Sequence, residues 1–214
     1  MPLAAGLTKQ LLKDTGASVP VFCGPMYPGS NPELIAAVSK AGGFGIVQPL
    51  ALTHLYGHDF RRGLQLIKSL SGGRPFGVNF TILPNAKYAK MMDEYMDIAI
   101  EEDVKFFLTS LGKPDPIVER AHAAGIKVYH DVHNTKLAQR AVDAGVDGLN
   151  LLNSDMGGQT GSLRAAEFIE QVANLNLGVP LLCAGGIGEL KLCFSSGIYN
   201  IAIYSTLLIF CGVQ

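Results

Sequence analysis

Residues 121–128 read AHAAGIKV, and residues 141–149 repeat the pattern as AVDAGVDGL. In each copy small residues end a helix, a glycine turns the chain, and an apolar run begins a strand. The small-residue helix end and its glycine are also present at residues 39–42, which read SKAG. One such unit cannot bury its apolar face alone, so the repeats predict neighbouring parallel strands covered by helices.

The same alternation extends through most of the chain. Asn31 is expected to cap a helix with Pro32 in its first turn, and Gly42 and Gly43 are expected to end it. Helices are predicted at residues 31–41, 59–70, 89–102, 135–144 and 162–174, and strands at 19–26, 44–49, 75–82, 105–111, 127–132, 148–153, 179–184 and 198–204. We therefore expect a single-domain α/β protein over residues 1–214, a parallel (β/α)8 TIM-type barrel whose last β/α unit is degenerate or truncated. An open doubly wound sheet is the alternative.

Composition limits the partners. Hydrophobic residues make up 48% of the chain and charged residues 16%, which suits strands buried on both faces. Seventeen basic residues balance 18 acidic ones, so we expect a small-molecule partner and no nucleic acid. The four cysteines form no C-x-x-C pair, and neither a metal site nor a disulfide framework is indicated. The N-terminus lacks a signal-type segment, so a cytoplasmic location is expected.

The stretch from residue 192 to 214 carries no charged residue and approaches the length of a membrane span, about 20 residues. Ser195, Gly197 and Asn200 argue against a span, and the stretch continues the barrel rhythm. A membrane partner is therefore not expected, although a membrane-tethered form is kept as an alternative.

Barrel enzymes carry their chemistry on the loops after the carboxyl ends of the strands. The candidates at these positions are Gly24, Pro25, Met26, Gln48, Asn79, Ser110, His130, Asp131, Asn153, Gly157, Gly158, Ala184, Gly185 and Gly186. Glycines let backbone N–H groups approach a phosphate, although each glycine pair taken singly also fits an ordinary turn. Neither pair belongs to a G-x-G-x-x-G fingerprint and no Walker-type lysine is present, so a Rossmann dehydrogenase or an ATPase is not indicated.

A set of motifs resembles the nitronate monooxygenase family (2-nitropropane dioxygenases) in order and spacing. The motifs are GPM at residues 24–26, AGGFG at 41–45, PFGVN at 75–79, AAGIKV at 123–128, AGVDG at 144–148, GGQTG at 157–161 and CAGGIG at 183–188. The resemblance covers about residues 19–188 and fades over residues 189–214. It implies an FMN-dependent TIM barrel that oxidises alkyl nitronates with O2.

The resemblance also implies roles for particular residues. Pro25 and Met26 would lie beneath the flavin and Asn79 at its polar edge. The phosphate would be surrounded by Gly157, Gly158, Gly185 and Gly186, with Gly24, Ala184 and Ser205 nearby. Gln48, Asp131 and Asn153 are assigned to the cofactor pocket more loosely, and their alternative is a structural role at the polar barrel rim.

Two departures from the family pattern affect the expected chemistry. Gln159 stands where the family commonly has its catalytic histidine, and glutamine cannot take up a proton near neutral pH. The site is therefore expected to prefer nitronates over neutral nitroalkanes, unless His130 at a strand end supplies the base. Tyr204-Ser205-Thr206 occupies the place of the family's phosphate-binding glycine-threonine pair.

These observations favour an oxidoreductase in which Gln159 orients the substrate, with a nitronate and O2 as its small-molecule partners. One alternative is an NAD(P)H-dependent quinone or enoyl reductase on the same flavin barrel. Another is a non-catalytic remnant of the family, because the end of the chain is altered. A homodimer is one option for its assembly.

Overall fold

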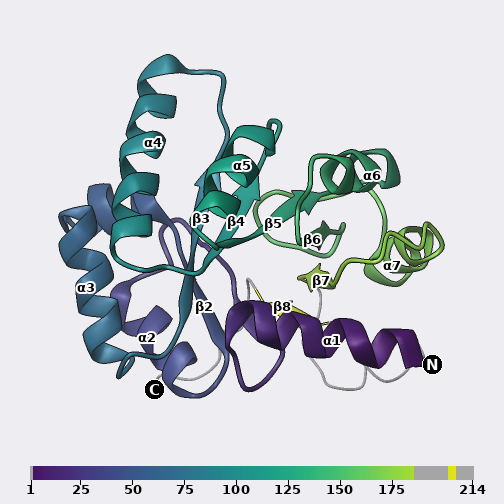
Figure 1. The fold of residues 1–214 in the computed structure, drawn as a ribbon, viewed down its shortest axis with the longest axis horizontal. Coiled ribbons are helices and arrows are strands. Elements are labelled where there is room, and N and C mark those ends of the chain that lie inside the picture. The colour runs from purple at the N-terminus through teal and green to yellow at the C-terminus, as the bar shows by residue number, and fades with distance from the viewer. Residues whose placement is uncertain (1, 186–201, 206–214) are drawn as a thin grey trace.

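The computed structural model describes residues 2–185 and 202–205, and its strands form one closed barrel in which neighbouring strands are parallel. The strands follow chain order, and β8 pairs with both β7 and β1 (Figure 1). They are β1 (Val21–Cys23), β2 (Phe44–Val47), β3 (Phe76–Thr81), β4 (Phe106–Ser110), β5 (Lys127–Val132), β6 (Gly148–Leu152), β7 (Leu181–Ala184) and β8 (Ala202–Ser205). The predicted barrel is confirmed, and the open sheet is wrong.

Helices cover the outside of this barrel (Figure 1). They are α2 (Pro32–Lys40), α3 (Phe60–Leu70), α4 (Ala86–Glu101), α5 (Asp115–Ala123), α6 (Thr135–Asp143) and α7 (Ala165–Ala173), with α1 (Pro2–Thr15) before β1 and a short π-helix η1 (Ala51–Leu55) after β2. Asn31, Asn85 and Asn134 each accept a hydrogen bond from the backbone N–H three residues on, at 2.7, 3.0 and 2.9 Å. These caps satisfy otherwise unpaired N–H groups and fix the helix starts. The predicted helices therefore agree with the structure to within a few residues. The end of α5 was predicted from the repeat at residues 121–128, whereas its start, α1 and η1 were not predicted.

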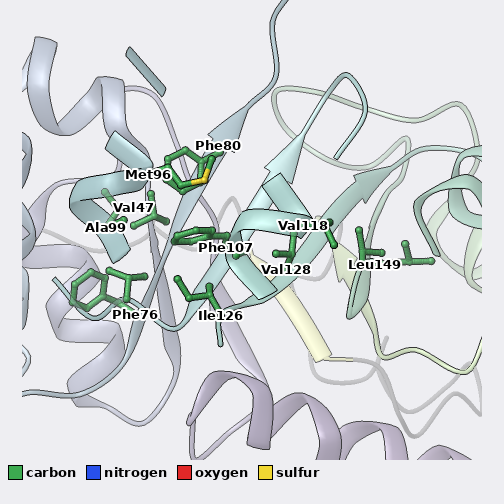
Figure 2. Packing of buried hydrophobic residues seen from close by; sticks show 14 of the residues in the cluster. Val47, Phe76, Phe80, Met96, Ala99, Phe107, Val118, Ile126, Val128 and Leu149 are labelled. Carbon is green, nitrogen blue, oxygen red and sulfur yellow. The ribbon is translucent and has the colours of Figure 1, made fainter. Parts of the chain in front are cut away.

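Side chains alternate between the two faces of each strand and so form two cores. Phe80, Phe107, Val128 and Leu149 point outward and pack beneath the helices (Figure 2). Phe22, Phe44, Phe106 and Tyr129 belong to the inner core, with successive ring centroids 5.3, 5.0 and 4.9 Å apart. The interior of the barrel is therefore packed at this level.

Helix α1 covers one end of the barrel. Leu11 is 1% exposed and packs with the inner core. The Tyr129 hydroxyl donates a hydrogen bond of 3.0 Å to the Asp14 carboxylate, which also accepts one of 2.6 Å from Gln10. Burial raises the pKa of Asp14, and these two donors partly offset the rise. Helix α1 therefore covers the amino ends of the strands.

The uncharged stretch of residues 192–214 includes β8, which lies in the barrel wall. Among the helices that the structure describes, none is long and apolar enough to cross a membrane. The part of the stretch that can be described is thus a strand of the barrel, as predicted, and residues 198–201 of the predicted strand lie outside the described residues.

Candidate functional site

A row of polar side chains faces the interior at the carboxyl ends of β3 and β4. The Asn79 amide donates hydrogen bonds to the Ser110 hydroxyl and to the Leu108 carbonyl, both at 3.2 Å. The Thr81 hydroxyl lies 3.3 Å from the Ser110 hydroxyl and donates to Asn79 Oδ1 at 3.3 Å. Their inward direction follows from alternation, because Val78, Phe80 and Phe107 occupy the helix-facing positions.

The row continues on β5 and β6 with Asp131 and Asn150. These two residues are paired in the strand register, and Asn150 Nδ2 donates to Asp131 Oδ1 at 2.6 Å. Asn150 is fully buried, yet its Oδ1 has no partner among the described residues. Burial raises the pKa of the Asp131 carboxyl to about 7, and the Asn150 donor partly opposes that rise. Asp131 is therefore a carboxyl group that changes charge near neutral pH.

The loop after β6 is tied to the end of β7. Asn153 is fully buried, and its amide donates to the Ala184 carbonyl. Its Oδ1 accepts from the Asp155 N–H at 2.9 Å and its carbonyl from the Gly161 N–H at 3.2 Å. A Cβ added to Gly185, which has a φ of +78°, would lie 2.5 Å from Met156 Cα. The two glycine-bearing loops thus lie directly against each other, as expected.

This loop presents unpaired backbone donors. The N–H groups of residues 157–160 donate to no other residue of the described chain. Gly158 has a φ of +84°, and a Cβ added there would meet nothing within 4 Å. Successive free N–H groups beside open space suit an anionic group such as a phosphate. Gln159 lies exposed within this same segment.

The loop after β1 is compact. Met26 N–H donates to the Ser30 hydroxyl at 2.7 Å, and that hydroxyl reaches the Gly24 carbonyl at 3.4 Å. Pro25 and Met26 are half-buried here and offer an apolar surface at the mouth of the barrel. Gln48, after β2, accepts the Ala51 N–H through its side chain at 2.8 Å and so helps begin η1.

His130 lies apart from these residues, because it is on the opposite face of β5 from Asp131. Its neighbours along the strand, Val128 and Val132, both pack in the outer core. His130 is 5% exposed, its Nδ1 lies 2.8 Å from the Thr109 hydroxyl, and burial lowers its pKa to about 4. The alternation of the strand therefore places His130 in the helix-facing layer and not with the inward polar row.

Two of the predicted site residues, Gly186 and Ser205, are not fully described by the structure. Gly186 lies outside the described residues, and Ser205 is described only as the last residue of β8, paired with Cys23 of β1. Thr81 and Asn150 were missed by the sequence interpretation. Both lie within strands in the inward alternation, and the signal that could have found them is a polar residue two positions from another inward-facing residue.

Among the residues that the structure describes, no group of His, Cys, Asp or Glu side chains is arranged to hold a metal ion. The candidate site therefore combines an open backbone cradle, formed by the unpaired N–H groups of residues 157–160 after β6, with an apolar surface after β1 and a polar row from β3 to β6. All three lie at the carboxyl ends of the strands.

Comparison with known proteins adds sequence and structural relatives. A family model described as nitronate monooxygenase matches residues 9–209. The chain is 28% identical to a nitronate monooxygenase of Neurospora crassa over 64% of this chain and 43% of the relative. It is 26% identical to an octahydroindene carboxyl-CoA dehydrogenase of Rhodococcus jostii over 84% of this chain and 48% of the relative. The chain spans about half the length of these curated relatives.

The fold is also shared with a solved structure. The structure of FabK from Thermotoga maritima matches with a TM-score of 0.77 and 23% identity, over 92% of this chain and 60% of that one. This likeness supports the barrel architecture.

Proposed function

The chain belongs to the nitronate monooxygenase family, and we propose that it is an FMN-dependent oxidoreductase that oxidises alkyl nitronates with O2. The observation that carries the proposal is that the open cradle at residues 157–160 and the inward polar row both lie at the carboxyl ends of barrel strands. The unpaired N–H groups could bind a phosphate, and the polar row could form hydrogen bonds with the polar edge of a ring system. Such a combination suits a flavin mononucleotide.

The residues present fit FMN at three places. The free N–H groups of residues 157–160, with Gly185 packed behind them, would hold the phosphate dianion. Pro25 and Met26 would support the flat ring system, and Asn79 would offer the remaining lone pair of its Oδ1 to the pyrimidine edge. When bound, the flavin would supply the electron-transfer chemistry, since no side chain of this row does so.

Gln159 would orient the substrate. It lies within the open cradle and its side chain is exposed, so its amide can donate to a nitronate oxygen without taking up a proton. A nitronate already carries the negative charge that the oxidation needs, whereas a neutral nitroalkane must first lose a carbon-bound proton. A neutral nitroalkane could therefore be a substrate only if the site contains a base, whereas a nitronate needs none.

The test begins with the purified protein reconstituted with FMN. We expect a flavin absorbance band that survives gel filtration, and O2 consumption that depends on ethyl nitronate. Gln159→Ala, which keeps the cradle, should raise the KM for the nitronate while flavin content stays the same. Retained flavin without nitronate oxidation would contradict the substrate, whereas failure to bind any flavin would favour the non-catalytic remnant.

A reductase using NAD(P)H is the second candidate. The relative named as an octahydroindene carboxyl-CoA dehydrogenase is one reason to retain it. The other is that each segment after β1 to β4 carries an exposed apolar side chain, which suits a substrate larger than a short nitronate; these are Tyr27, Leu55, Tyr56, Leu83 and Leu111. NADH oxidation that depends on a quinone or an enoyl thioester, without nitronate turnover, would establish this alternative.

A further inference from the structure

We propose that Asp131 is the general base of this site and takes the proton from the carbon next to the nitro group of a neutral nitroalkane. This inference rests on the proposed function and extends it from nitronates to their neutral acids. The sequence indicates His130 as the candidate base, because Gln159 cannot take up a proton. Asp131 is a different residue, near the end of the same strand as His130.

The position of Asp131 carries the first part of the argument. It lies one residue before the end of β5 and faces the barrel interior, in the same alternation as Tyr129. On β4 the inward residue at the same level is Ser110, one step beyond the registered pair Thr109 and His130. Asp131 is only partly buried, so its carboxyl lies within reach of a ligand that enters at the open end.

Asn150 carries the second part. Its Nδ2 holds one Asp131 oxygen at 2.6 Å, while its own Oδ1 is buried and has no partner among the described residues. Buried polar atoms are rarely left unpaired, because an unpaired one has lost its hydrogen bonds to water without replacement. A bound molecule with a donor, or the protonated form of Asp131, would satisfy this acceptor. The pair is therefore built for a carboxyl group that gains a proton and interacts with a ligand.

The charges around Asp131 favour this role. The groups that face it are Ser110 from β4, Asn150 from β6 and, deeper in the barrel, Tyr129 with Asp14 of α1. None of them is a cation, and no charged side chain contributes measurably to the titration of Asp131. A base is most effective when its pKa lies near the working pH, and burial has brought the pKa of Asp131 to about 7.

The proposed step balances as a proton transfer. One oxygen of the Asp131 carboxylate forms an O–H bond as the Cα–H bond of the nitroalkane breaks. The electron pair of that bond moves into the nitro group, so the product is the nitronate and the carboxyl becomes neutral. Asn150 Oδ1 can then accept a hydrogen bond from the new O–H group of Asp131, or Asn150 Nδ2 can continue to donate to the other carboxyl oxygen. The proton leaves to solvent when the nitronate is consumed.

The test is the exchange of the α-protons of nitroethane with D2O, followed by proton NMR without O2 on FMN-loaded protein. We expect exchange above the uncatalysed rate that rises with pH through about 7 and then levels off, because only the carboxylate accepts a proton. Asp131→Asn should reduce the enzymatic part at least ~100-fold. His130→Asn, which can still reach Thr109, should leave it unchanged.

A second variant keeps the inference testable if Asp131→Asn folds poorly. Asn150→Ala removes the donor that lowers the pKa of Asp131, so the midpoint of the exchange profile should move to higher pH. Carbon-13 labelling of the aspartate carboxyls gives the same titration without any turnover. An Asp131 signal that is already fully ionised at pH 5, or full exchange in Asp131→Asn, would overturn the inference.

The two proposals fail in different ways. Exchange that depends on Asp131, together with no oxidation of ethyl nitronate, would remove the proposed function and leave the base in place. Oxidation of ethyl nitronate without any exchange of nitroethane would remove the base and leave the function. Loss of exchange in His130→Asn, with Asp131→Asn unaffected, would assign the base to the outer face of β5 instead.

Discussion

Replacing Gly185 by alanine tests whether the two glycine loops truly pack against each other. Gly185, Gly158 and Gly125 have similar positive φ values of +78°, +84° and +72°, so an alanine at any of them meets the same backbone strain, about 1–2 kcal/mol. Their surroundings differ. A Cβ at 185 would lie 2.5 Å from Met156 Cα and 2.7 Å from its Cβ, whereas nothing lies within 4 Å of one at 158 or 125.

The added cost at Gly185 comes from moving backbone, because the nearest atom is a Cα and cannot rotate away. Overpacking of this kind costs about 1–3 kcal/mol beyond the strain. Gly185→Ala should therefore lose about 2–5 kcal/mol and Gly158→Ala about 1–2 kcal/mol. For a chain of this size 1 kcal/mol corresponds to roughly 2–4 °C in Tm, so Gly185→Ala should melt roughly 2–12 °C below Gly158→Ala.

The assay is thermal unfolding followed by far-ultraviolet circular dichroism, on the three alanine variants without flavin. Gly125→Ala, in the turn before β5 at the other end of the barrel, should match Gly158→Ala and so controls for strain alone. Equal melting temperatures for all three variants would refute the reasoning, because they would mean that residue 185 and Met156 are not in contact.

Three further predictions follow from the barrel and its mouth. Gly158→Val should lower FMN affinity sharply, since its side chain would fill the space beside the free N–H groups; equilibrium dialysis with FMN measures this, and unchanged affinity would exclude the loop from the phosphate site. Deleting residues 198–214 removes β8 and leaves β1 and β7 as unpaired edges, so light scattering should show aggregation; a truncated protein that melts cooperatively as a monomer would contradict the closing role of β8. Tyr129→Phe should lower the free energy of unfolding by about 1–3 kcal/mol, because Asp14 loses a buried hydrogen-bond donor. Loss of this donor raises the pKa of Asp14 in the folded state further, so the loss of stability should grow as the pH rises and Asp14 becomes charged. A deficit that is the same at pH 4 and pH 8 would show that the bond does not depend on the charge of Asp14.

Much of the fold could be predicted because each barrel unit repeats local signals. β5 has the predicted bounds, and the cap at Asn31 lies where the sequence placed it. The structure describes the eighth strand at residues 202–205, which overlaps the end of the predicted range 198–204, and residues 198–201 lie outside the described residues. α1 escaped prediction because its contacts, such as that of Asp14 with Tyr129, join residues 115 positions apart.

The candidate site was predictable only at the level of strand ends. Glycines after β6 and β7 were identified because backbone approach demands them, and the structure shows their loops in contact. Asn150 was not, because its importance comes from the register that places it beside Asp131. The register between parallel strands depends on the geometry of the whole barrel, so it cannot be predicted from a single sequence.

His130 and Asp131 show why a strand end alone does not identify a base. Adjacent residues on a strand face opposite sides, so one of the two must lie among the helices and the other in the barrel. Burial then acts on them with opposite sign, because it disfavours the charged form of each. It lowers the pKa of the histidine to about 4, where the ring stays neutral, and raises that of the aspartate to about 7. Burial thus moves the pKa of His130, whose ordinary value is the nearer to neutrality, away from neutral pH. It moves the pKa of Asp131, which faces the barrel interior, toward neutral pH.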